Sequence, residues 1–455
     1  MRTSLDHPSR SLTRQPSNRH PSSRQPPGRR HPDRRHPGRP AAAHRPTRRL
    51  RARALAALLL AAAGALAGCG TSGETGSARV GGACESPGVT AGNIRLGLLF
   101  PDSGSAQSLF GSFRAGVDAR LGVANSAGGV HGRQVTYDWE DDASDPRTNL
   151  AGATALVDRG AFAILESTSA SSGSAEFLHD KGIPVAGTSL EEPWTIYDNM
   201  FSYSNLLSES GSVSTYGDFV AAHGGHSAVM VVSQYTETSL DFAAELTASL
   251  KAAGIQVVAT VDATAPINLE GLGHKIKDSG ADVLVGTVTG SSFGQAVLAA
   301  RGAQANLQVI LSPAGYDQRI LNVFKAIIAG AYFVADFLPF ETGRPAHRQF
   351  LAAMSRYAPE TQPATQQAAL SGWISTDIML RGLQVASDCP TRASLISALR
   401  AVRGYTADGL LTQPIDFRAD FGKLTRCLAF VQVNPDGTRF TPVDPLPRCG
   451  QPVAR

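Results

Sequence analysis

Short apolar runs alternate with stretches of helical period from Asn93 onward. Leu109, Phe113, Val117 and Leu121 recur at every fourth position, which is the spacing of one face of a helix. Other runs, such as residues 228–232, are apolar without alternation, as in strands buried on both faces of a parallel sheet. The apolar runs predict strands at residues 94–100, 134–139, 161–165, 183–186, 228–232, 257–258, 283–285, 309–311 and 330–337.

Helical segments are predicted between these strands. One begins at Asp145-Pro146, where proline is tolerated in the first turn, and another is closed by Gly254. Further helices are predicted after the loop 167–172, over 209–222 and through most of 347–402, and a strand-like segment over 415–433 ends in a turn at 434–437. Two sets of strand–helix units of similar size predict an α/β chain with two doubly wound parallel-sheet lobes.

The first 53 residues differ in composition from the rest of the chain. They contain 15 arginines and two acidic residues, a net charge of +13, so the whole-chain value of +4 leaves −9 for the remainder. Residues 1–47 are too polar to bury a core, and we expect a disordered basic leader upstream of a true translation start near Arg48. Because the positive charge is confined to this leader, a nucleic-acid partner is not expected.

An uncharged run from Ala54 to Gly68 follows basic residues. It is shorter than the roughly 20 residues of a membrane span and has the length of a secretory h-region. It ends in Leu66-Ala67-Gly68-Cys69, which resembles the lipobox of bacterial lipoproteins, the alternative being an ordinary signal peptide with a chance cysteine. We therefore predict a signal peptide over 48–68, lipidation at Cys69 and a flexible tether over 69–91.

The mature chain keeps four more cysteines. An even number in an exported protein predicts two disulfides, for which three connectivities are possible. We favour Cys389–Cys427 with Cys84–Cys449. No pair has the CxxC spacing of zinc or thioredoxin-like sites, and neither a metal nor a cofactor is predicted.

Enzymatic signatures are sparse in this sequence. The GxxxxGK[ST] and HExxH motifs are absent, and His223 and His226 are the only close histidine pair. The acidic residues 138–142 are interpreted as a solvated strand end rather than a carboxylate or calcium site. The chain is therefore not expected to be an enzyme.

Polar loops follow the predicted strands, at the sheet edge where doubly wound folds bind ligands. They span 102–108, 167–172, 188–192, 234–239, 287–292 and 312–317, and include the candidate ligand hydroxyls of Ser105 and Thr289. The loop 167–172 offers hydroxyls and backbone N–H groups for a ligand carboxylate, with helix capping alone as the alternative. Tyr235 and Tyr316 are predicted either to stack on a ligand or to close the cleft.

Short motifs are spread over the body of the chain, at 94–97 (IRLG), 101–104 (PDSG), 115–117 (AGV), 125–133 (NSAGGVHGR), 141–146 (DDASDP), 155–157 (ALV), 182–185 (GIPV), 253–255 (AGI), 280–283 (GADV) and 389–392 (CPTR). Together they resemble the branched-chain amino acid-binding (Leu/Ile/Val-type) family of ABC-transporter receptors over about residues 92–435. The resemblance implies a type I periplasmic-binding-protein fold. Its two lobes, joined by a three-strand hinge, close on a ligand, and the liganded form docks on a permease.

The resemblance also implies site residues. By position, Thr168 and Ser169 match the family's carboxylate-binding loop, and Thr188 and Ser189 its partner loop. Cleft aromatics of the two lobes correspond to Phe110 and Tyr235, and an acid for a ligand ammonium falls near Tyr316 and Asp317. The loop 189–194 (SLEEPW) departs from the Ala/Thr-rich loop of amino-acid binders, so amides, aromatic acids and other small polar metabolites stay open.

These inferences predict a monomeric, extracytoplasmic solute-binding lipoprotein of an ABC importer, held on the outer face of the cell membrane only by lipidated Cys69. Its ligand is expected to be an amino acid, an amide or a related carboxylate. Lobe I is predicted over 92–212 and 337–402, and lobe II over 213–336 and 403–450. One alternative is a sensor that signals to a membrane kinase. A second is a transcription regulator, although the sequence lacks a DNA-binding helix pair. The third is an exported hydrolase, although the sequence has no recognisable catalytic triad.

Overall fold

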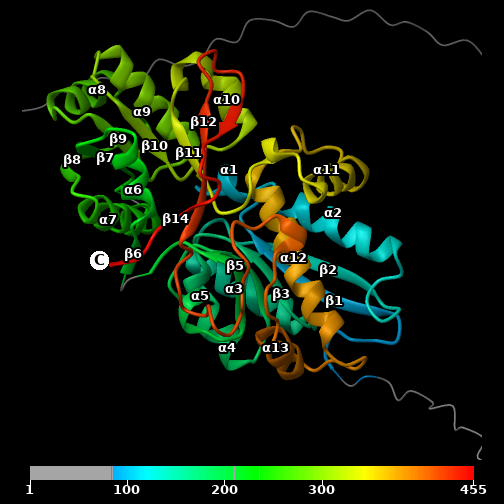
Figure 1. Cartoon of the computed structure of the whole chain (residues 1–455). Coiled ribbons are helices and arrows are strands. Elements are labelled where there is room, and N and C mark those ends of the chain that lie inside the picture. Colours follow the sequence, from blue (N-terminus) through cyan, green and yellow to red (C-terminus); the bar gives the residue numbers. More distant parts are fainter. Residues whose placement is uncertain (1–83, 85, 209–210, 235) are drawn as a thin grey trace, which may run out of the picture. The chain divides into compact units, whose positions relative to one another are not determined.

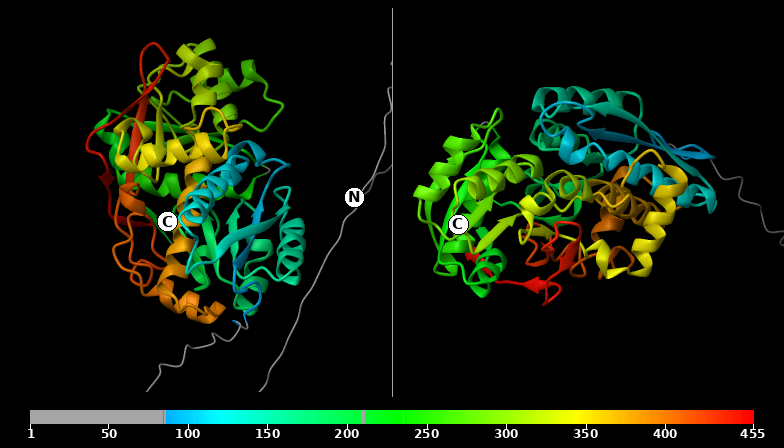
Figure 2. Two further views of the ribbon diagram at one scale, coloured as in Figure 1. Left: turned by 90° about the vertical axis from the view of Figure 1, so that its right-hand side faces the viewer. Right: turned by 90° about the horizontal axis from the view of Figure 1, so that it is seen from above.

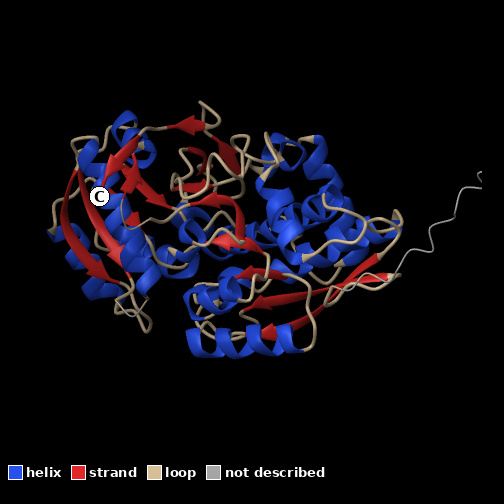
Figure 3. Ribbon diagram, turned by 90° about the horizontal axis from the view of Figure 1, so that it is seen from below, coloured by secondary structure: helices blue, strands red, loops and turns tan. Residues whose placement is uncertain are grey.

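The computed structural model describes residues 84, 86–208, 211–234 and 236–455 (Figure 1). The predicted leader, the signal peptide, Cys69 and Tyr235 lie outside the described residues. Within these ranges, helices lie on both sides of two main sheets (Figure 3). None of the described helices combines the length and the apolar character needed to cross a membrane.

The first sheet consists of five parallel strands in the order β2-β1-β3-β4-β5. Its interior strands are buried along most of their length because helices cover both faces. This order and the parallel pairing confirm the predicted doubly wound lobe. The strands are β1 Asn93–Phe100, β2 Gln134–Asp141, β3 Ile164–Ser167, β4 Val185–Ser189 and β5 Met200–Asn205.

Helices from two parts of the chain cover the first sheet. Those of the first half are α1 Gln107–Phe110, α2 Phe113–Ser126, α3 Pro146–Asp158, α4 Ala175–Asp180 and α5 Pro193–Ile196, with the 3₁₀ turn η1 Ser171–Gly173. Later helices α11 Pro345–Tyr357, α12 Gln367–Val385 and α13 Arg392–Arg400 return to it. In Figure 2, α12 (orange) packs beside α2 (cyan), and a Cβ built on Gly116 would lie 1.8 Å from the Ala369 carbonyl oxygen. Glycine therefore permits this close contact between the two helices.

The second sheet has the order β13-β12-β11-β10-β9-β7-β8. Its parallel strands are β7 Ser227–Val232, β8 Gln256–Asp262, β9 Val283–Gly286, β10 Val309–Ser312 and β11 Tyr332–Ala335. Antiparallel strands β12 Cys427–Val433, β13 Phe440–Pro442 and β14 Arg448–Cys449 complete it. The remaining elements are β6 Gly211–Val213, β15 Pro452–Ala454, α6 Thr215–Ala222, α7 Glu237–Ala252, α8 Leu269–Asp278, α9 Gly290–Gly302, α10 Gln318–Phe324, η2 Lys325–Ile328, η3 Phe340–Thr342 and η4 Ala407–Gly409.

Several details of the predicted elements are wrong. Leu109 does not share a buried helix face with Phe113, Val117 and Leu121, because it lies on the separate short helix α1 and is 38% exposed. The segment 211–213, predicted as helix, is strand β6 and pairs with β15 at the far end of the chain. Strand β12 begins only at Cys427, so most of the predicted segment 415–433 is loop. Val258 is 45% exposed because β8 lies at an edge of its sheet, so the apolar pair 257–258 is not buried on both faces.

The predicted disulfide connectivity is also wrong. Cys84 is bonded to Cys389, with 5.2 Å between their Cα atoms, and Cys427 is bonded to Cys449, with 4.0 Å. Cys427 and Cys449 are register partners on the antiparallel strands β12 and β14. Cys84 lies in the segment that enters β1, and Cys389 lies between α12 and α13. Each pair thus joins segments that the fold already places side by side.

Three chain crossings connect the two sheets: after β5, after β11, and before β12. Backbone and hydroxyl groups of Asn205 and Thr425 bond the first crossing to the third. The backbone N–H of Leu338 donates to the Leu410 carbonyl, which bonds the second crossing to the chain near η4. These contacts form the three-strand hinge that the resemblance implied.

The segment before β12 contacts the first sheet, not only the second. The Tyr405 hydroxyl donates to Asp377 on α12 at 2.7 Å, and the Phe417 and Phe201 rings meet edge to face at 5.8 Å. These contacts place part of the segment from residue 403 onward against lobe I. Its assignment to lobe II stays a prediction.

Candidate functional site

The carboxyl ends of β3 and β4 bring the four predicted lobe I residues together. Ser167 at the end of β3 donates from Oγ to Thr188 Oγ1 on β4 at 3.1 Å. Thr168 is fully buried, accepts from the Ala170 N–H at 3.1 Å and donates to Asp142. Ser189 is also buried, and its Oγ has no hydrogen-bond partner among the described residues. Ser169 is half-buried beside Thr168.

The serine loop after β3, predicted to contact a ligand carboxylate, binds a carboxylate of the chain itself in this structure. Glu191, in the loop after β4, accepts from Ser171 Oγ at 2.6 Å, from the Ser172 N–H at 3.2 Å and from Ser172 Oγ at 3.0 Å. Trp194 Nε1 donates to Ser171 Oγ at 3.0 Å and fixes this hydroxyl in place. The donors that were predicted to contact ligand at Ser171 and Ser172 are therefore already used.

A second internal carboxylate uses the donors of the loop after β1. Asp141 accepts from the N–H groups of Asp102 and Ser103, from Ser103 Oγ and from the Ala143 N–H. Partial burial acts to raise the pKa of Asp141, but these hydrogen bonds outweigh it and lower the pKa below its usual value. Ser105 lies exposed in the same loop, and Phe110 is buried at the end of α1.

The acidic residues 138–142 are not simply a solvated strand end. Asp142 is fully buried and accepts from the Ser144 N–H at 2.9 Å and from Asn149 Nδ2 at 3.2 Å. Asn149 Nδ2 also donates to Glu166, at 3.0 Å. Burial raises the pKa of Glu166 to about 8, against the Asn149 hydrogen bond and with a smaller contribution from the Asp142 and Glu191 charges. A fully buried carboxyl thus lies beneath the loops of lobe I.

Hydroxyl groups also follow the strands of the second sheet. Thr287, after β9, donates from Oγ1 to the Ser239 carbonyl at 2.8 Å, and the Ser239 hydroxyl accepts from the Ser233 N–H at 3.0 Å. Thr289 caps α9 by accepting from the Ser292 N–H at 3.3 Å, and it is half-buried. The capping interaction leaves the second lone pair of the Thr289 hydroxyl for another donor.

Tyr316 and Asp317 both have partners within the chain. Tyr316 is 2% exposed, donates to Glu341 at 2.5 Å and accepts from the Phe340 N–H at 2.8 Å. It borders a cavity of about 10 Å³, which is room for a single water molecule. Asp317 caps α10 and pairs with Arg319 at 2.6 Å. In this structure the Asp317 carboxylate is therefore used as a helix cap and as the partner of Arg319.

A buried polar cluster lies where the crossings meet. Asp336, directly after β11, accepts from the hydroxyls of Ser204 and Tyr203 on β5, and Tyr203 also bonds Ser371 on α12 at 2.7 Å. Burial raises the pKa of Asp336, partly offset by these hydrogen bonds. The carboxyl ends of β5 and β11 are thus joined directly at the hinge.

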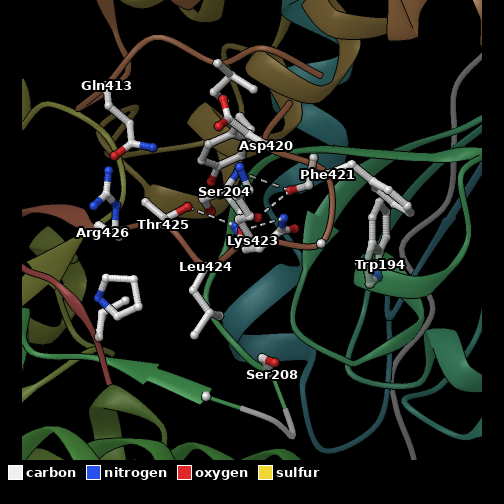
Figure 4. Close-up of a pocket in the computed structure, with 18 of the residues that line it drawn as sticks. Trp194, Ser204, Ser208, Gln413, Asp420, Phe421, Lys423, Leu424, Thr425 and Arg426 are labelled. Carbon is white, nitrogen blue, oxygen red and sulfur yellow. Dashed lines mark hydrogen bonds between the residues drawn. The ribbon is translucent and has the colours of Figure 1, made fainter. Parts of the chain in front are cut away.

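A cavity of about 740 Å³ lies along the outer edge of β5, between the segment 413–426 and strands β6 and β15 (Figure 4). None of the predicted ligand residues lines it. Arg400 stacks between Phe201 and Phe421, at 4.3 and 4.1 Å from the ring centroids, and its guanidinium donates to three backbone carbonyls. Burial lowers the pKa of Arg400 to about 10. Because the cavity runs along a strand rather than at strand ends, we do not assign it the ligand.

One motif was missed in the sequence. Residues 290–294 (GSSFG) have GxSxG spacing and follow a strand at the start of a helix, as a nucleophile elbow does. The Ser292 hydroxyl contacts Thr289 rather than a histidine, so no triad forms around it. Within the described residues, no three His, Cys, Asp or Glu side chains are grouped as metal ligands.

Two doubly wound lobes, joined by three crossings and carrying polar loops at their carboxyl edges, define a hinged α/β binding protein. The periplasmic binding protein family matches residues 93–438, which include both lobes. The chain belongs to this family, and the predicted resemblance and fold are confirmed.

Curated relatives match over shorter stretches. A Leu/Ile/Val-binding protein homolog 2 of Brucella abortus is 33% identical over 73 residues, which cover 16% of this chain and 20% of that protein. The Leucine-, isoleucine-, valine-, threonine-, and alanine-binding protein of Pseudomonas aeruginosa is 26% identical over 174 residues, 37% of this chain and 46% of that protein. The chain thus spans less than half the length of these curated relatives.

Solved structures share the fold at low sequence identity. An ABC transporter substrate-binding protein of Aeropyrum pernix has a TM-score of 0.69 at 15% identity, covering 80% of this chain and 97% of that chain. A branched chain amino acid ABC transporter structure from Thermus thermophilus with bound valine has a TM-score of 0.67 at 16% identity (78% and 96%). A solute binding protein of R. palustris in complex with benzoate has a TM-score of 0.65 at 16% identity (80% and 98%).

Sequence reasoning did not single out Glu166, Glu191, Asp336 and Arg400. Glu166 had a detectable signal, since it is the one charged residue in the short apolar run that becomes β3. Glu191 lies in the loop that departs from the amino-acid binders, but its partners are 19 and 20 residues away. Asp336 and Arg400 bond to segments more than 100 residues away, which no local pattern reveals.

Proposed function

We propose that this protein is the extracytoplasmic solute-binding component of an ABC importer, which captures a small polar solute and delivers it to a membrane permease. The observation that carries the proposal is the family match across both lobes, together with the polar loops that follow the strands of both sheets. Closure about the three crossings would bring the loops of both lobes onto one solute.

The proposed contacts come from both sides of the hinge. On lobe I they are Ser105, Phe110, Thr168, Ser169, Thr188 and Ser189; on lobe II they are Tyr235, Thr289, Tyr316 and Asp317. Buried or half-buried hydroxyls dominate this set, which suits a small polar solute. The buried and unpartnered Ser189 hydroxyl is the clearest local support, because an unsatisfied polar group costs free energy until a partner reaches it.

Proteins of the same fold provide examples of solutes that support the proposed class. Structures similar to this chain were determined with isoleucine, valine, benzoate and 4-hydroxybenzoate. We propose an amino acid, an amide or a related carboxylate for this protein. Catalytic turnover of such a solute is not expected.

A thermal-shift screen tests solute binding directly. A solute present at a hundred times its dissociation constant stabilises the folded state by about 2.7 kcal/mol, which raises the melting temperature by several degrees. The screen pairs amino acids, their amides and aromatic acids at equal ionic strength. A melting temperature that stays unchanged across the whole panel contradicts the proposal.

Lipid anchoring forms a separate part of the proposal. We propose that Cys69 carries the lipid and that the anchored protein faces a permease in the same membrane. Cys69→Ala is expected to move the protein from the membrane fraction to the soluble fraction, with the nearby Ser72→Ala as a control that leaves Cys69 and the disulfides intact. Continued tight membrane association of the Cys69→Ala variant would refute lipidation at this residue.

A further inference from the structure

The serine loop after β3 is a built carboxylate cradle. Three donors converge on one carboxylate: the hydroxyl of Ser171, and the hydroxyl and backbone N–H of Ser172. Ser171 is buried and held by Trp194, which is itself buried between the loop and the sheet. Rigid donors aimed at a single point are what recognition of a carboxylate requires.

Glu191 occupies this cradle from the neighbouring loop. Its two oxygens accept all three hydrogen bonds, at 2.6 to 3.2 Å. The cradle lies at the surface, because Ser172 is exposed and Glu191 is half-buried. A ligand carboxylate reaching the end of β3 would therefore have to displace a carboxylate that the chain already holds at high effective concentration.

Adjacent donors on the same sheet edge are used in the same way. Asp141 takes the N–H groups and the hydroxyl of the loop after β1, and Asp142 takes the Ser144 N–H. Asp141 keeps a pKa below its usual value, so its carboxylate is ionised at neutral pH. The edge therefore has few unused anion donors and carries negative charge at Asp141, both of which disfavour an anionic group.

We infer that Glu191 is a specificity-determining residue, which fills the carboxylate cradle of lobe I so that the bound solute presents an uncharged or cationic group there. This inference rests on the proposed solute-binding function and narrows its solute class. A solute that is held by its carboxylate, and therefore binds more tightly as the acid than as the amide, contradicts it.

Chemical rescue tests the cradle without any knowledge of the solute. In the Glu191→Ala variant, sodium acetate is expected to raise the melting temperature by a few degrees beyond sodium chloride at the same concentration, with saturation. The wild-type protein and Glu191→Gln, whose amide still fills the space, are the matched controls and should respond to acetate no more than to chloride. Adding Ser172→Ala to Glu191→Ala should reduce the acetate effect several-fold.

Equal acetate responses in the wild type, Glu191→Gln and Glu191→Ala would overturn the inference, as would a Glu191→Ala variant whose melting temperature does not respond to acetate.

A second measurement uses the wild-type protein alone, so it does not depend on the folding of a variant. Isoleucine is compared with isoleucinamide, and benzoate with benzamide, by titration calorimetry. The amide is expected to bind more tightly in each pair that binds, and a tighter acid overturns the inference. The acetate experiment needs no transported solute, so a failed solute screen leaves its outcome readable.

Discussion

Replacing Glu166 by glutamine should change how stability depends on pH. The Glu166 carboxyl is fully buried at the end of β3, and burial raises its pKa to about 8 from a reference value of 4.5. The folded protein therefore keeps the proton that the unfolded chain releases above pH 4.5. Because the unfolded state binds fewer protons between these two values, the free energy of unfolding falls as pH rises through that window.

The size of this effect follows from the two pKa values. The full difference corresponds to about 5 kcal/mol, at about 1.4 kcal/mol for each pKa unit. Between pH 5.5 and pH 8, this residue accounts for a loss of about 3 kcal/mol. Glutamine resembles the protonated acid and keeps an oxygen for the Asn149 Nδ2 hydrogen bond, but it releases no proton.

Urea unfolding of the wild type and Glu166→Gln at pH 5.5 and at pH 8 measures the difference. The variant is expected to gain about 3 kcal/mol relative to the wild type at the higher pH. Glu245→Gln is an independent second test, because burial also raises the pKa of Glu245 to about 8, but on helix α7 of the other lobe. The two changes should add in the double variant, since the sites do not share partners. If Glu166→Gln and the wild type follow parallel pH profiles, Glu166 is ionised in the folded protein and the reasoning fails.

Two further predictions concern the packing and the covalent links of the fold. Gly116→Ala should lower the free energy of unfolding by about 2 kcal/mol or more, because the added methyl group would meet the Ala369 carbonyl oxygen at 1.8 Å. Gly92→Ala, whose methyl group would have no atom within 4 Å, is the control in the same urea assay. Equal stability of the two variants would contradict the contact between α2 and α12. Non-reducing peptide mapping should recover Cys84–Cys389 and Cys427–Cys449, whereas a Cys389–Cys427 peptide would disprove this pairing. Removing the Cys84–Cys389 disulfide, whose cysteines are 305 residues apart, should lower the free energy of unfolding by about 5 kcal/mol. Removing Cys427–Cys449, whose cysteines are 22 residues apart, should lower it by about 3 kcal/mol.

The layered fold was predictable because it follows from local pattern. Apolar runs such as 228–232 and 283–285 are buried on both faces, and they became interior parallel strands. Features that depend on distant pairing were not predictable. Strand β6 forms by pairing with β15 near the C-terminus, more than 200 residues away, and Cys427 meets Cys449 by a strand register that no local signal sets.

The candidate site was predictable to the level of loops but not of partners. The serine loop after β3 has the composition of an anion cradle, and the structure places it at the expected sheet edge. The sequence does not show that Glu191 reaches this loop, because that contact depends on how far β3 and β4 extend side by side. Likewise, Asp317 reads as a candidate ligand for an ammonium group, but its position at the start of α10 makes it a helix cap.

The central claim is that a small polar solute binds between the two lobes and draws them together. Small-angle X-ray scattering on the protein from residue 84 onward, with and without a solute that raises its melting temperature, tests this claim most directly. The account predicts a smaller radius of gyration in the presence of the saturating solute, reversed on its removal. A stabilising solute that leaves the radius of gyration unchanged would contradict closure about the hinge.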